Sequence, residues 1–199
     1  MRRFSGILCT CCLLLSACLR GGFFADAGSS SSSDLPAPDG SGDTTVKDAK
    51  GFQHLYLEAE SGALFAPFAV RDDPQASAGK YLIDHDLATG KHTDGEAHYT
   101  VTVLVPGDFH LWGRTRAPAT DVDSFFVAVD DQHATAYHTS TRGLSDQWTW
   151  TVVGTLLSEE VTPATYTLGA GTHTIVLSSR ESGSQIDRLL LTDDLPFNP

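Results

Sequence analysis

This sequence has few of the patterns that build helices and few basic residues. No long segment repeats apolar residues at positions i, i+3, i+4 and i+7, so long amphipathic helices are not predicted. Lys and Arg number 13 against 25 Asp and Glu, and they form no basic stripe that could follow a phosphate backbone. We therefore expect no nucleic-acid binding, and no binding of the folded part to anionic lipid.

Cysteine is confined to the start of the chain, where all four cysteines lie within the first 18 residues. Arg2 and Arg3 precede a short apolar run, Ile7–Leu15, which is too short to span a bilayer as a stable helix. Removal of this segment as a signal peptide would leave Cys18 alone, which excludes an internal disulfide.

The apolar run ends in Leu15-Ser16-Ala17-Cys18, which resembles the signal of bacterial lipoproteins. The resemblance implies a signal peptide over residues 1–17 and a lipid on Cys18, the first residue of the mature chain. Leucine rather than aspartate follows the cysteine, which in lipoproteins implies sorting to the outer membrane. An ordinary secretory signal cut near Ala17 is the alternative. In the lipoprotein interpretation, the protein contacts the membrane through its lipid only.

Residues 18–51 are predicted to form a flexible tether. Five consecutive serines at 29–33 are followed by a stretch rich in Pro and Gly, with few apolar residues. Such a segment buries too little apolar surface to offset the entropy of ordering it. A flexible chain of this length spans roughly 30 Å, which would hold a folded head, expected at residues 52–199, just off a membrane surface.

The head is predicted to be all-β, because short segments rich in Val, Thr, Phe, Tyr and Trp alternate apolar and polar residues between Gly and Pro turn signals. Many short strands of this kind are typical of a β-sandwich. The expected strands are His54–Glu60, Ala63–Val70 (at an edge or bent because of Pro67), Lys80–Asp84, Ala97–Val105, a hairpin within Gly107–Asp131, Ala134–Ser140, Trp148–Val153, a hairpin of Ala164–Leu168 with Thr172–Ser179, and Gln185–Thr192.

The segment Gly107–Asp131 has an unusual outer face. Alternation puts Phe109 and Leu111 of the first strand on the apolar face, with Phe125 and Val127 of the second. It puts Trp112, Arg114 and Arg116 on the opposite face. Tryptophan and arginine are both favoured where a partner docks. The face is expected to be either the wall of a ligand site or an internal brace of arginines and carboxylates.

The order of motifs along the head resembles carbohydrate-binding modules of families 6 and 35. These motifs are Leu-Glu-Ala-Glu at 57–60, Ala-Ser-Ala-Gly-Lys-Tyr-Leu at 76–82, Tyr-Thr-Val-Thr-Val at 99–103, Pro-Gly-Asp-Phe at 106–109, Gly-Thr-His-Thr-Ile at 171–175 and Ile-Asp-Arg-Leu-Leu-Leu at 186–191. The resemblance implies a galactose-binding-like jelly-roll β-sandwich of two antiparallel sheets, sugar binding without catalysis, and a structural calcium ion.

Calcium is compatible with the residues concerned. Glu58 and Glu60 lie two positions apart on an expected strand, so their carboxylates share a face and repel unless a cation lies between them. Calcium binds six to eight oxygen atoms. The alternative is an exposed acidic strand that pairs with Arg188 or Arg71. The ligands implied by the resemblance are Glu58, Glu60, Ser77, the backbone carbonyl of Lys80, and Asp187.

A sugar site needs an aromatic platform and polar groups that donate and accept hydrogen bonds. Trp148 and Trp150 are expected on one face, or in the core as the alternative. Arg114 suits an acidic sugar such as a uronate, although it could instead pair with Glu181 or Asp123. The candidate sugar-binding residues are Trp112, Arg114, Asp123, Tyr137, Trp148, Trp150 and Arg180, with Asp146 nearby.

Two placements of the sugar site remain open. A site on the end loops would use Tyr81, Asp84, His85, Tyr137 and Trp148. A site on the concave face would use Trp112, Arg114, Trp150 and Arg180.

Other chemistry has little support in the sequence. The eight histidines are scattered and form no close ligand pair apart from the loosely spaced His133 and His138, so no zinc site is predicted. There is no Gly-x-Ser-x-Gly nucleophile motif and no phosphate-binding loop. Acidic residues such as Asp121 and Asp123 are expected to be solvated loop residues rather than a glycosidase pair. We expect no enzyme.

Two functions from different classes fit these observations. The first is a lipid-anchored carbohydrate-binding head that holds a polysaccharide at the bacterial cell surface. The second is a structural or interaction module of the cell envelope, whose Trp/Arg face docks another envelope protein.

Overall fold

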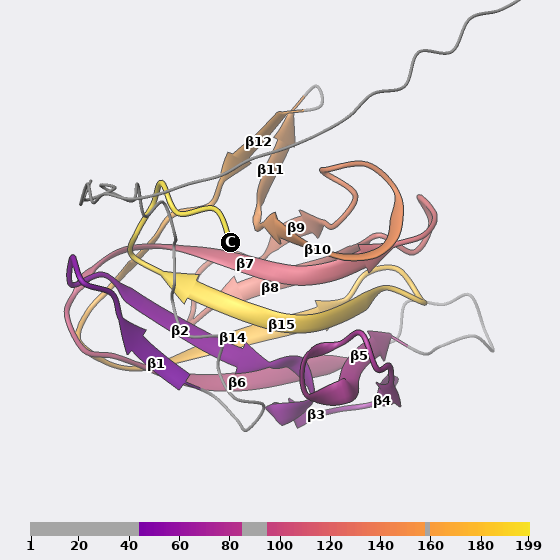
Figure 1. Ribbon diagram of the computed structural model, residues 1–199, viewed down its shortest axis with the longest axis horizontal. Coiled ribbons are helices and arrows are strands. Elements are labelled where there is room, and N and C mark those ends of the chain that lie inside the picture. Colours follow the sequence, from indigo (N-terminus) through magenta and orange to yellow (C-terminus); the bar gives the residue numbers. More distant parts are fainter. Residues whose placement is uncertain (1–43, 85–94, 158–159) are drawn as a thin grey trace, which may run out of the picture. The chain divides into compact units, whose positions relative to one another are not determined.

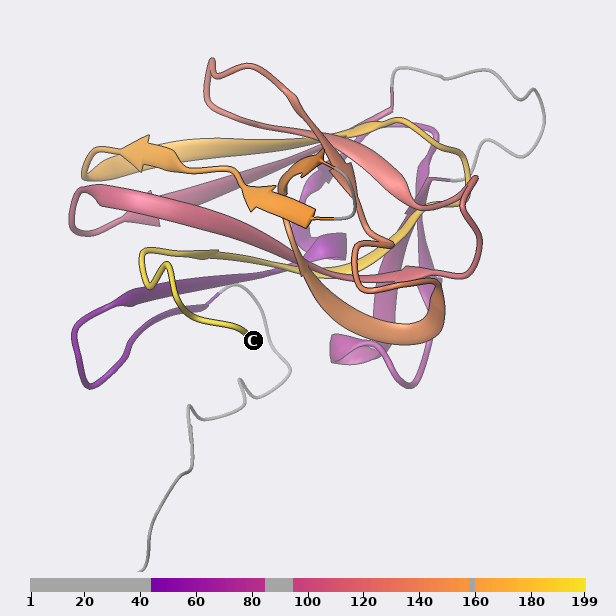
Figure 2. The ribbon, with the colours of Figure 1, turned by 90° about the horizontal axis from the view of Figure 1, so that it is seen from above.

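The computed structural model describes residues 44–84, 95–157 and 160–199. They form two large antiparallel β-sheets that pack face to face and a separate two-stranded sheet (Figure 1, Figure 2). The 3-10 helices η1 (Ala59–Ser61) and η2 (Ser77–Gly79) interrupt the strands. Within these ranges no helix is long and apolar enough to cross a membrane. The strands are β1 (Thr44–Lys47), β2 (Gln53–Glu58), β3 (Ala63–Leu64), β4 (Phe68–Asp72), β5 (Lys80–Asp84), β6 (Glu96–Val103), β7 (Gly107–Ala117), β8 (Ser124–Val129), β9 (Thr135–His138), β10 (Ser145–Val152), β11 (Gly154–Leu157), β12 (Glu160–Pro163), β13 (Tyr166–Leu168), β14 (Gly171–Ser179) and β15 (Gln185–Thr192).

The first sheet is arranged around the C-terminal strand β15. This strand pairs with β7 along one edge and with β2 and β5 along the other. Strands β1 and β4 extend the sheet beyond β2 and β5, and β10 and β13 extend it beyond β7. The last strand of the chain thus joins segments from both halves of the head.

The second sheet has the strand order β3-β6-β14-β8-β9, and its apolar face covers that of the first sheet. The predicted alternation is confirmed, because the residues expected to point inward on β7 and β8, such as Phe109, Leu111, Phe125 and Val127, are completely buried. Together with the comparison with known structures given below, this confirms the predicted all-β sandwich.

Two predicted hairpins are wrong. Strand β7 belongs to the first sheet and β8 to the second, while β13 pairs with β7 and the next strand, β14, pairs with β6 and β8. Each pair of strands has an apolar face, and crossing between sheets lets those faces meet across the core. A hairpin within one sheet would have placed both faces on the same side.

The folded part begins earlier than predicted. Strand β1, Thr44–Lys47, pairs with β2, so at least residues 44–51 belong to the head and not to the tether. The remaining predicted tether, the signal segment and Cys18 lie outside the described residues. The expected strand Ala63–Val70 is divided at Pro67 into β3 and β4, which lie in different sheets. The two-stranded sheet β11-β12 was not predicted.

Candidate functional site

The outer face of the first sheet carries a row of large polar and aromatic side chains. Trp150 of β10 pairs with Arg114 of β7, which pairs with Arg188 of β15, which in turn pairs with Glu58 of β2. Residues paired across neighbouring strands share a face of the sheet. The four side chains therefore form one row across four strands, on the face opposite the core residues Leu57 and Leu189.

An aromatic group lies beside this row. The guanidinium of Arg188 lies 4.9 Å from the centre of the Tyr56 ring. The rings of Tyr56 and Trp150 approach edge to face, with 6.3 Å between their centroids. Trp150 is half-buried and not part of the core, so the core alternative for this residue is wrong.

A second aromatic group surrounds Trp148. The Arg116 guanidinium lies 4.5 Å from the centre of the Trp148 ring, and the Tyr81 ring lies 5.3 Å from it. Asp73 accepts a hydrogen bond from Trp148 Nε1 at 3.2 Å and pairs with Arg116 Nη1 at 2.9 Å. The pKa of Asp73 is lowered, first by the backbone N–H of Gln75 and then by these two side chains. Trp148 is half-buried, so it too lies outside the core.

Trp112 differs from the other two tryptophans. Only 8% of its surface is exposed, and its Nε1 is buried without a hydrogen-bond partner. The Arg142 guanidinium lies 6.0 Å from the Trp112 ring centre and donates a hydrogen bond to Asn198 in the C-terminal segment. Trp112 is therefore largely covered, and the exposed part of the platform consists of Trp148 and Trp150.

The arginines of this face pair with carboxylates of the chain. Arg114 forms an ion pair with Asp187, and Arg188 Nε lies 3.0 Å from Glu58 Oε1. The expected alternative partners of Arg114, Glu181 and Asp123, are wrong. A bulge between Ile186 and Arg188 explains the pairing, because it inserts Asp187 into the strand and changes the direction of its side chain. These pairs are of the kind expected for an internal brace of arginines and carboxylates, one of the two alternatives for this face.

Three carboxylates and a serine of the predicted calcium site lie together. Ser77 donates from its backbone N–H to Asp187 Oδ1 at 2.8 Å and from its hydroxyl to Glu58 Oε1 at 2.9 Å. Glu60 is not on strand β2 as expected but in helix η1, directly after it. Its pKa is raised, mainly by burial and further by the charges of Glu58 and Asp187, so its carboxylate lies near theirs.

The electrostatics of this group fit a cation. Burial raises the pKa of Asp187 to about 6, Arg114 opposes the shift, and the charge of Glu58 adds to it. Oε2 of Glu58 and Oε2 of Glu60 are both buried without a hydrogen-bond partner. Buried carboxylate oxygens without partners are costly, and calcium binds this type of atom. The side chain of Lys80 pairs with Asp72 at 3.1 Å, which leaves its backbone carbonyl as the predicted ligand.

Three candidate sugar-binding residues lie elsewhere. Arg180 pairs with Glu181 at 2.9 Å and lies 5.8 Å from the Phe126 ring centre, beside a cavity of about 300 Å³ at the second sheet. Asp123 is buried and accepts a hydrogen bond from Ser140, and burial raises its pKa. Neither residue lies on the outer face of the first sheet with the tryptophans and arginines. The prediction that Arg180 belongs to a sugar site on the concave face is therefore wrong.

Tyr137 is a core residue. It is completely buried, and its hydroxyl contacts Thr151 Oγ1 at 2.6 Å and donates toward the carbonyls of Gly113 and Thr151 at 3.2 and 3.1 Å. Gly113 makes room for it, because a Cβ at that position would lie 2.5 Å from the hydroxyl. The prediction that Tyr137 contacts a sugar is wrong. Of the other end-loop residues, Asp84 is buried and His85 lies outside the described residues.

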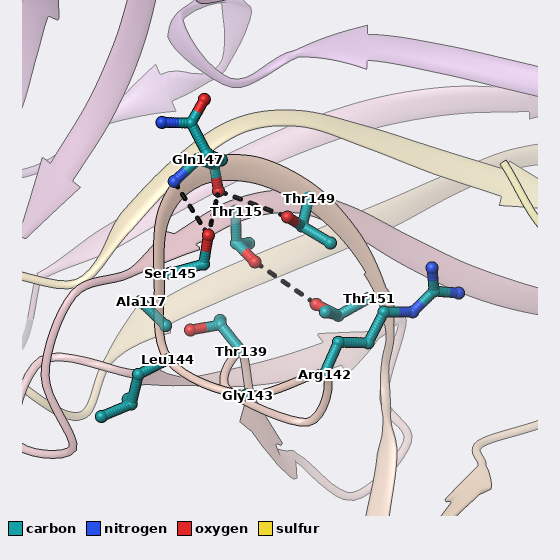
Figure 3. A pocket seen from close by; sticks show the side chains of 10 residues that line it. All are labelled: Thr115, Ala117, Thr139, Arg142, Gly143, Leu144, Ser145, Gln147, Thr149 and Thr151. Carbon is teal, nitrogen blue, oxygen red and sulfur yellow. Dashed lines mark hydrogen bonds between the residues drawn. The ribbon is translucent and has the colours of Figure 1, made fainter. Parts of the chain in front are cut away.

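Strand β10 has a second, polar side. A pocket of about 230 Å³ lies under the loop that precedes this strand, and hydroxyl groups dominate it (Figure 3). Thr115 Oγ1 lies 3.3 Å from Thr151 Oγ1, and Ser145 Oγ accepts a hydrogen bond from Gln147 N at 2.9 Å. Its lining offers no aromatic ring to the C–H face of a sugar. The half-buried indoles of Trp148 and Trp150 alternate with the Thr149 and Thr151 of this pocket, and they are the better platform.

Sequence reasoning missed Tyr56 and Asp73. Tyr56 alternates with the buried Leu55 and Leu57 on β2, but the register that sets it opposite Leu190, two residues from Arg188, leaves no signal in the sequence. Asp73 lies in a loop, where no local periodicity indicates that its carboxylate reaches Trp148 and Arg116.

No protein-family model matches this chain, and no curated protein matches it. Solved structures do match its fold. A GH26-CBM35 β-(1,4)-mannanase from Podospora anserina matches with a TM-score of 0.55 and 18% identity, over 73% of this chain and 29% of that chain. A family 35 carbohydrate binding module from Clostridium thermocellum matches with a TM-score of 0.51 and 13% identity, over 69% of this chain and 96% of that chain.

An exo-β-1,3-galactanase from Phanerochaete chrysosporium with galactose also matches, with a TM-score of 0.51 and 14% identity, over 69% of this chain and 29% of that chain. The matched region thus spans under a third of the mannanase and galactanase chains. These likenesses confirm the predicted fold, which is that of carbohydrate-binding modules. At such low identity they establish the fold alone.

Proposed function

We propose that this protein is a non-catalytic carbohydrate-binding module, held at the bacterial cell surface by a lipid on Cys18. The observation that carries the proposal is the pair of half-buried indoles, Trp148 and Trp150, two residues apart on one strand and on one face. Indole rings provide an apolar surface for sugar C–H groups. Arg116 and Asp73 hold Trp148 in place, so the platform is formed before a ligand binds.

We propose that the ligand is a polysaccharide that contains uronate residues. Arg114 pairs with Asp187 on one side, while its other nitrogen, Nη2, makes a longer bond of 3.3 Å to the carbonyl of Gln75. A carboxylate on the sugar would be a stronger acceptor for this donor than a neutral carbonyl. The indole of Trp150 lies opposite Arg114 in the sheet, where stacking and ion pairing can act on one sugar unit.

We propose that calcium stabilises the head through Glu58, Glu60 and Asp187, with Ser77 and the carbonyl of Lys80 as further ligands. The ion would join η1 and η2 to β15, because these residues come from all three elements or from their ends. Its role would be structural, because it would neutralise buried carboxylates whose negative charges repel one another.

Binding to immobilised polysaccharides tests the carbohydrate proposal. Wild-type protein is run in affinity gels that contain neutral or uronate-rich polysaccharides, beside Trp148→Ala and Phe126→Ala. Phe126 is the control, since it is an exposed aromatic residue of the second sheet. We expect retardation that is lost in Trp148→Ala and kept in Phe126→Ala, and greater retardation by the uronate-rich gel. Equal retardation of both variants, with both folded, contradicts the proposed site.

A structural or protein-docking role in the envelope is the second candidate. The pairing of Arg114, Arg116 and Arg188 with carboxylates of the chain favours it, because a brace of this kind stabilises the face without a ligand. Absence of binding to every glycan, with one envelope protein recovered by cross-linking through this face, would support that candidate. Replacement of Cys18 by alanine tests the anchor: we expect the protein to move from the outer-membrane fraction to the soluble fraction.

A further inference from the structure

Three potential metal ligands converge where the two ends of the folded head meet. Asp48 lies in the turn after β1, His54 lies on β2, and Asp194 follows β15. One nitrogen or oxygen atom from each lies within 4.8 Å of those of the other two. In both ribbon views the turn between β1 and β2 and the end of β15 lie at the same end of the sandwich (Figure 1, Figure 2).

The His54 imidazole is buried, and one of its ring nitrogens is available as a ligand. Only 1% of its surface is exposed, and its Nε2 has no hydrogen-bond partner. Its other nitrogen, Nδ1, lies 3.1 Å from the hydroxyl of Thr192. If Nδ1–H donates to that oxygen, Nε2 carries the lone pair. Metal-binding histidines commonly have such a second partner, which fixes the ring and its tautomer.

Hydrogen bonds position the Asp48 carboxylate and the Asp194 backbone independently of an ion. Asp48 Oδ1 accepts hydrogen bonds from the backbone N–H groups of Lys50 and Phe52, each at 2.9 Å, and its second oxygen is left for another partner. The backbone N–H of Asp194 donates to the Thr192 hydroxyl at 3.1 Å, which places this residue beside the imidazole. The Phe197 ring, 4.7 Å from the His54 ring, covers the group on one side.

The chemistry of this set distinguishes it from the proposed calcium site. An imidazole with two carboxylates suits zinc and related transition metals, whereas calcium prefers oxygen ligands alone. Two atoms that each lie about 2.1 Å from one zinc ion are roughly 3–4 Å apart, which the 4.8 Å limit on the observed separations accommodates. His54 and Glu58 are four residues apart on β2, or about 13 Å along a strand, so one ion cannot serve both sets.

We propose that Asp48, His54 and Asp194 form a zinc site that fastens the β1–β2 turn to the C-terminal segment. Three protein ligands leave room for water as a fourth. The ion would tie the end of the first described strand to residues that follow the last one. The scattered histidines gave no sign of this site, because its ligands are separated by up to 146 residues along the sequence and meet only through the pairing of β15 with β2.

Zinc titration of the full chain by isothermal calorimetry tests the site. The cysteines are first alkylated, because four thiols near the N-terminus would bind zinc themselves. The variants are Asp194→Asn and Asp48→Asn, which keep size and the hydrogen-bonding oxygen, and His54→Gln. His133→Ala, which removes an exposed histidine, is the matched control. Glu60→Gln reports on the proposed calcium site and should leave zinc binding unchanged.

We expect one zinc ion per wild-type chain, with an affinity that calcium in excess does not reduce. Each of the three ligand variants should weaken binding by about tenfold or more. Zinc should raise the melting temperature of the wild type, His133→Ala and Glu60→Gln more than that of the ligand variants. Circular dichroism shows whether each variant is folded. Zinc binding of equal strength in folded Asp194→Asn and wild type overturns the proposal, as does loss of binding in His133→Ala or the absence of zinc binding by the wild type.

Discussion

The guanidinium of Arg116 lies 4.5 Å from the centre of the Trp148 ring, and both side chains share Asp73 as an acceptor. Arg116 also donates from Nε and Nη2 to Gln185 Oε1, at 3.0 and 2.6 Å. The arginine is thus held in one plane by two acceptors, and its position fixes that of the indole. This arrangement makes Arg116 a positioning residue for the proposed sugar platform.

Replacement of Arg116 by lysine should therefore weaken polysaccharide binding while the head stays folded. Lysine keeps the charge but loses the planar group that contacts the ring and spans both acceptors. A cation–π contact at a partly exposed site contributes about 0.5–1 kcal/mol, so a loss of roughly two- to fivefold in affinity is expected. Affinity electrophoresis measures it. Arg180→Lys, at the second sheet, is the control and should bind as the wild type does.

The Tyr137 hydroxyl should matter for stability and not for binding. Tyr137→Phe would leave the carbonyls and hydroxyl of Gly113 and Thr151 without this donor in the core. An unsatisfied buried polar group costs about 1–3 kcal/mol, and urea unfolding should show a loss of that size. Polysaccharide affinity should be unchanged. A variant as stable as the wild type that binds less polysaccharide would instead place Tyr137 at the ligand.

The sequence predicted which face of each strand is buried, but not which strands or side chains pair with one another. Alternation correctly predicted the inward side of β7 and β8, because a one-residue error would expose every apolar side chain of a strand. It did not predict which sheet each strand joins, since the apolar face of β8 is buried equally well in a hairpin or across the core. The partner of Arg114 was missed for a related reason: the bulge at Asp187 moves that carboxylate, and a bulge leaves no periodic signal.

For the aromatic residues, too, the sequence predicts the face of the strand but not how deeply the side chain is buried. Trp148, Trp150 and Tyr137 all follow strand alternation, yet only the indoles remain accessible. The burial of Tyr137 depends on Gly113 in another sheet, whose missing side chain provides space for the ring. Such a pairing of a large residue with a glycine is a property of the packed core, and local sequence does not encode it.

Calcium should stabilise the head. A ligand that binds the folded state at 100 times its dissociation constant adds about 2.7 kcal/mol, which raises the melting temperature of a domain this size by about 5–10 °C. Differential scanning calorimetry with calcium and with EDTA measures the change. Glu60→Gln removes one proposed ligand and should abolish most of the shift. Lys47→Gln, on an exposed position of β1, serves as the control. An unchanged melting temperature in EDTA contradicts the calcium site.

The raised pKa of Asp187 makes the calcium-free head sensitive to pH. Its pKa is about 6 in the folded state and about 3.9 in an unfolded chain, so the folded state binds the proton more tightly. Stability from this group is therefore present below pH 4 and decreases as the pH rises from about 4 to about 6. In EDTA, the melting temperature of Asp187→Asn should lack this component of the pH dependence. Calcium requires the ionised carboxylate, so its effect on the wild type should be larger at pH 7 than at pH 5. A calcium effect that increases as the pH falls would be incompatible with Asp187 as a ligand.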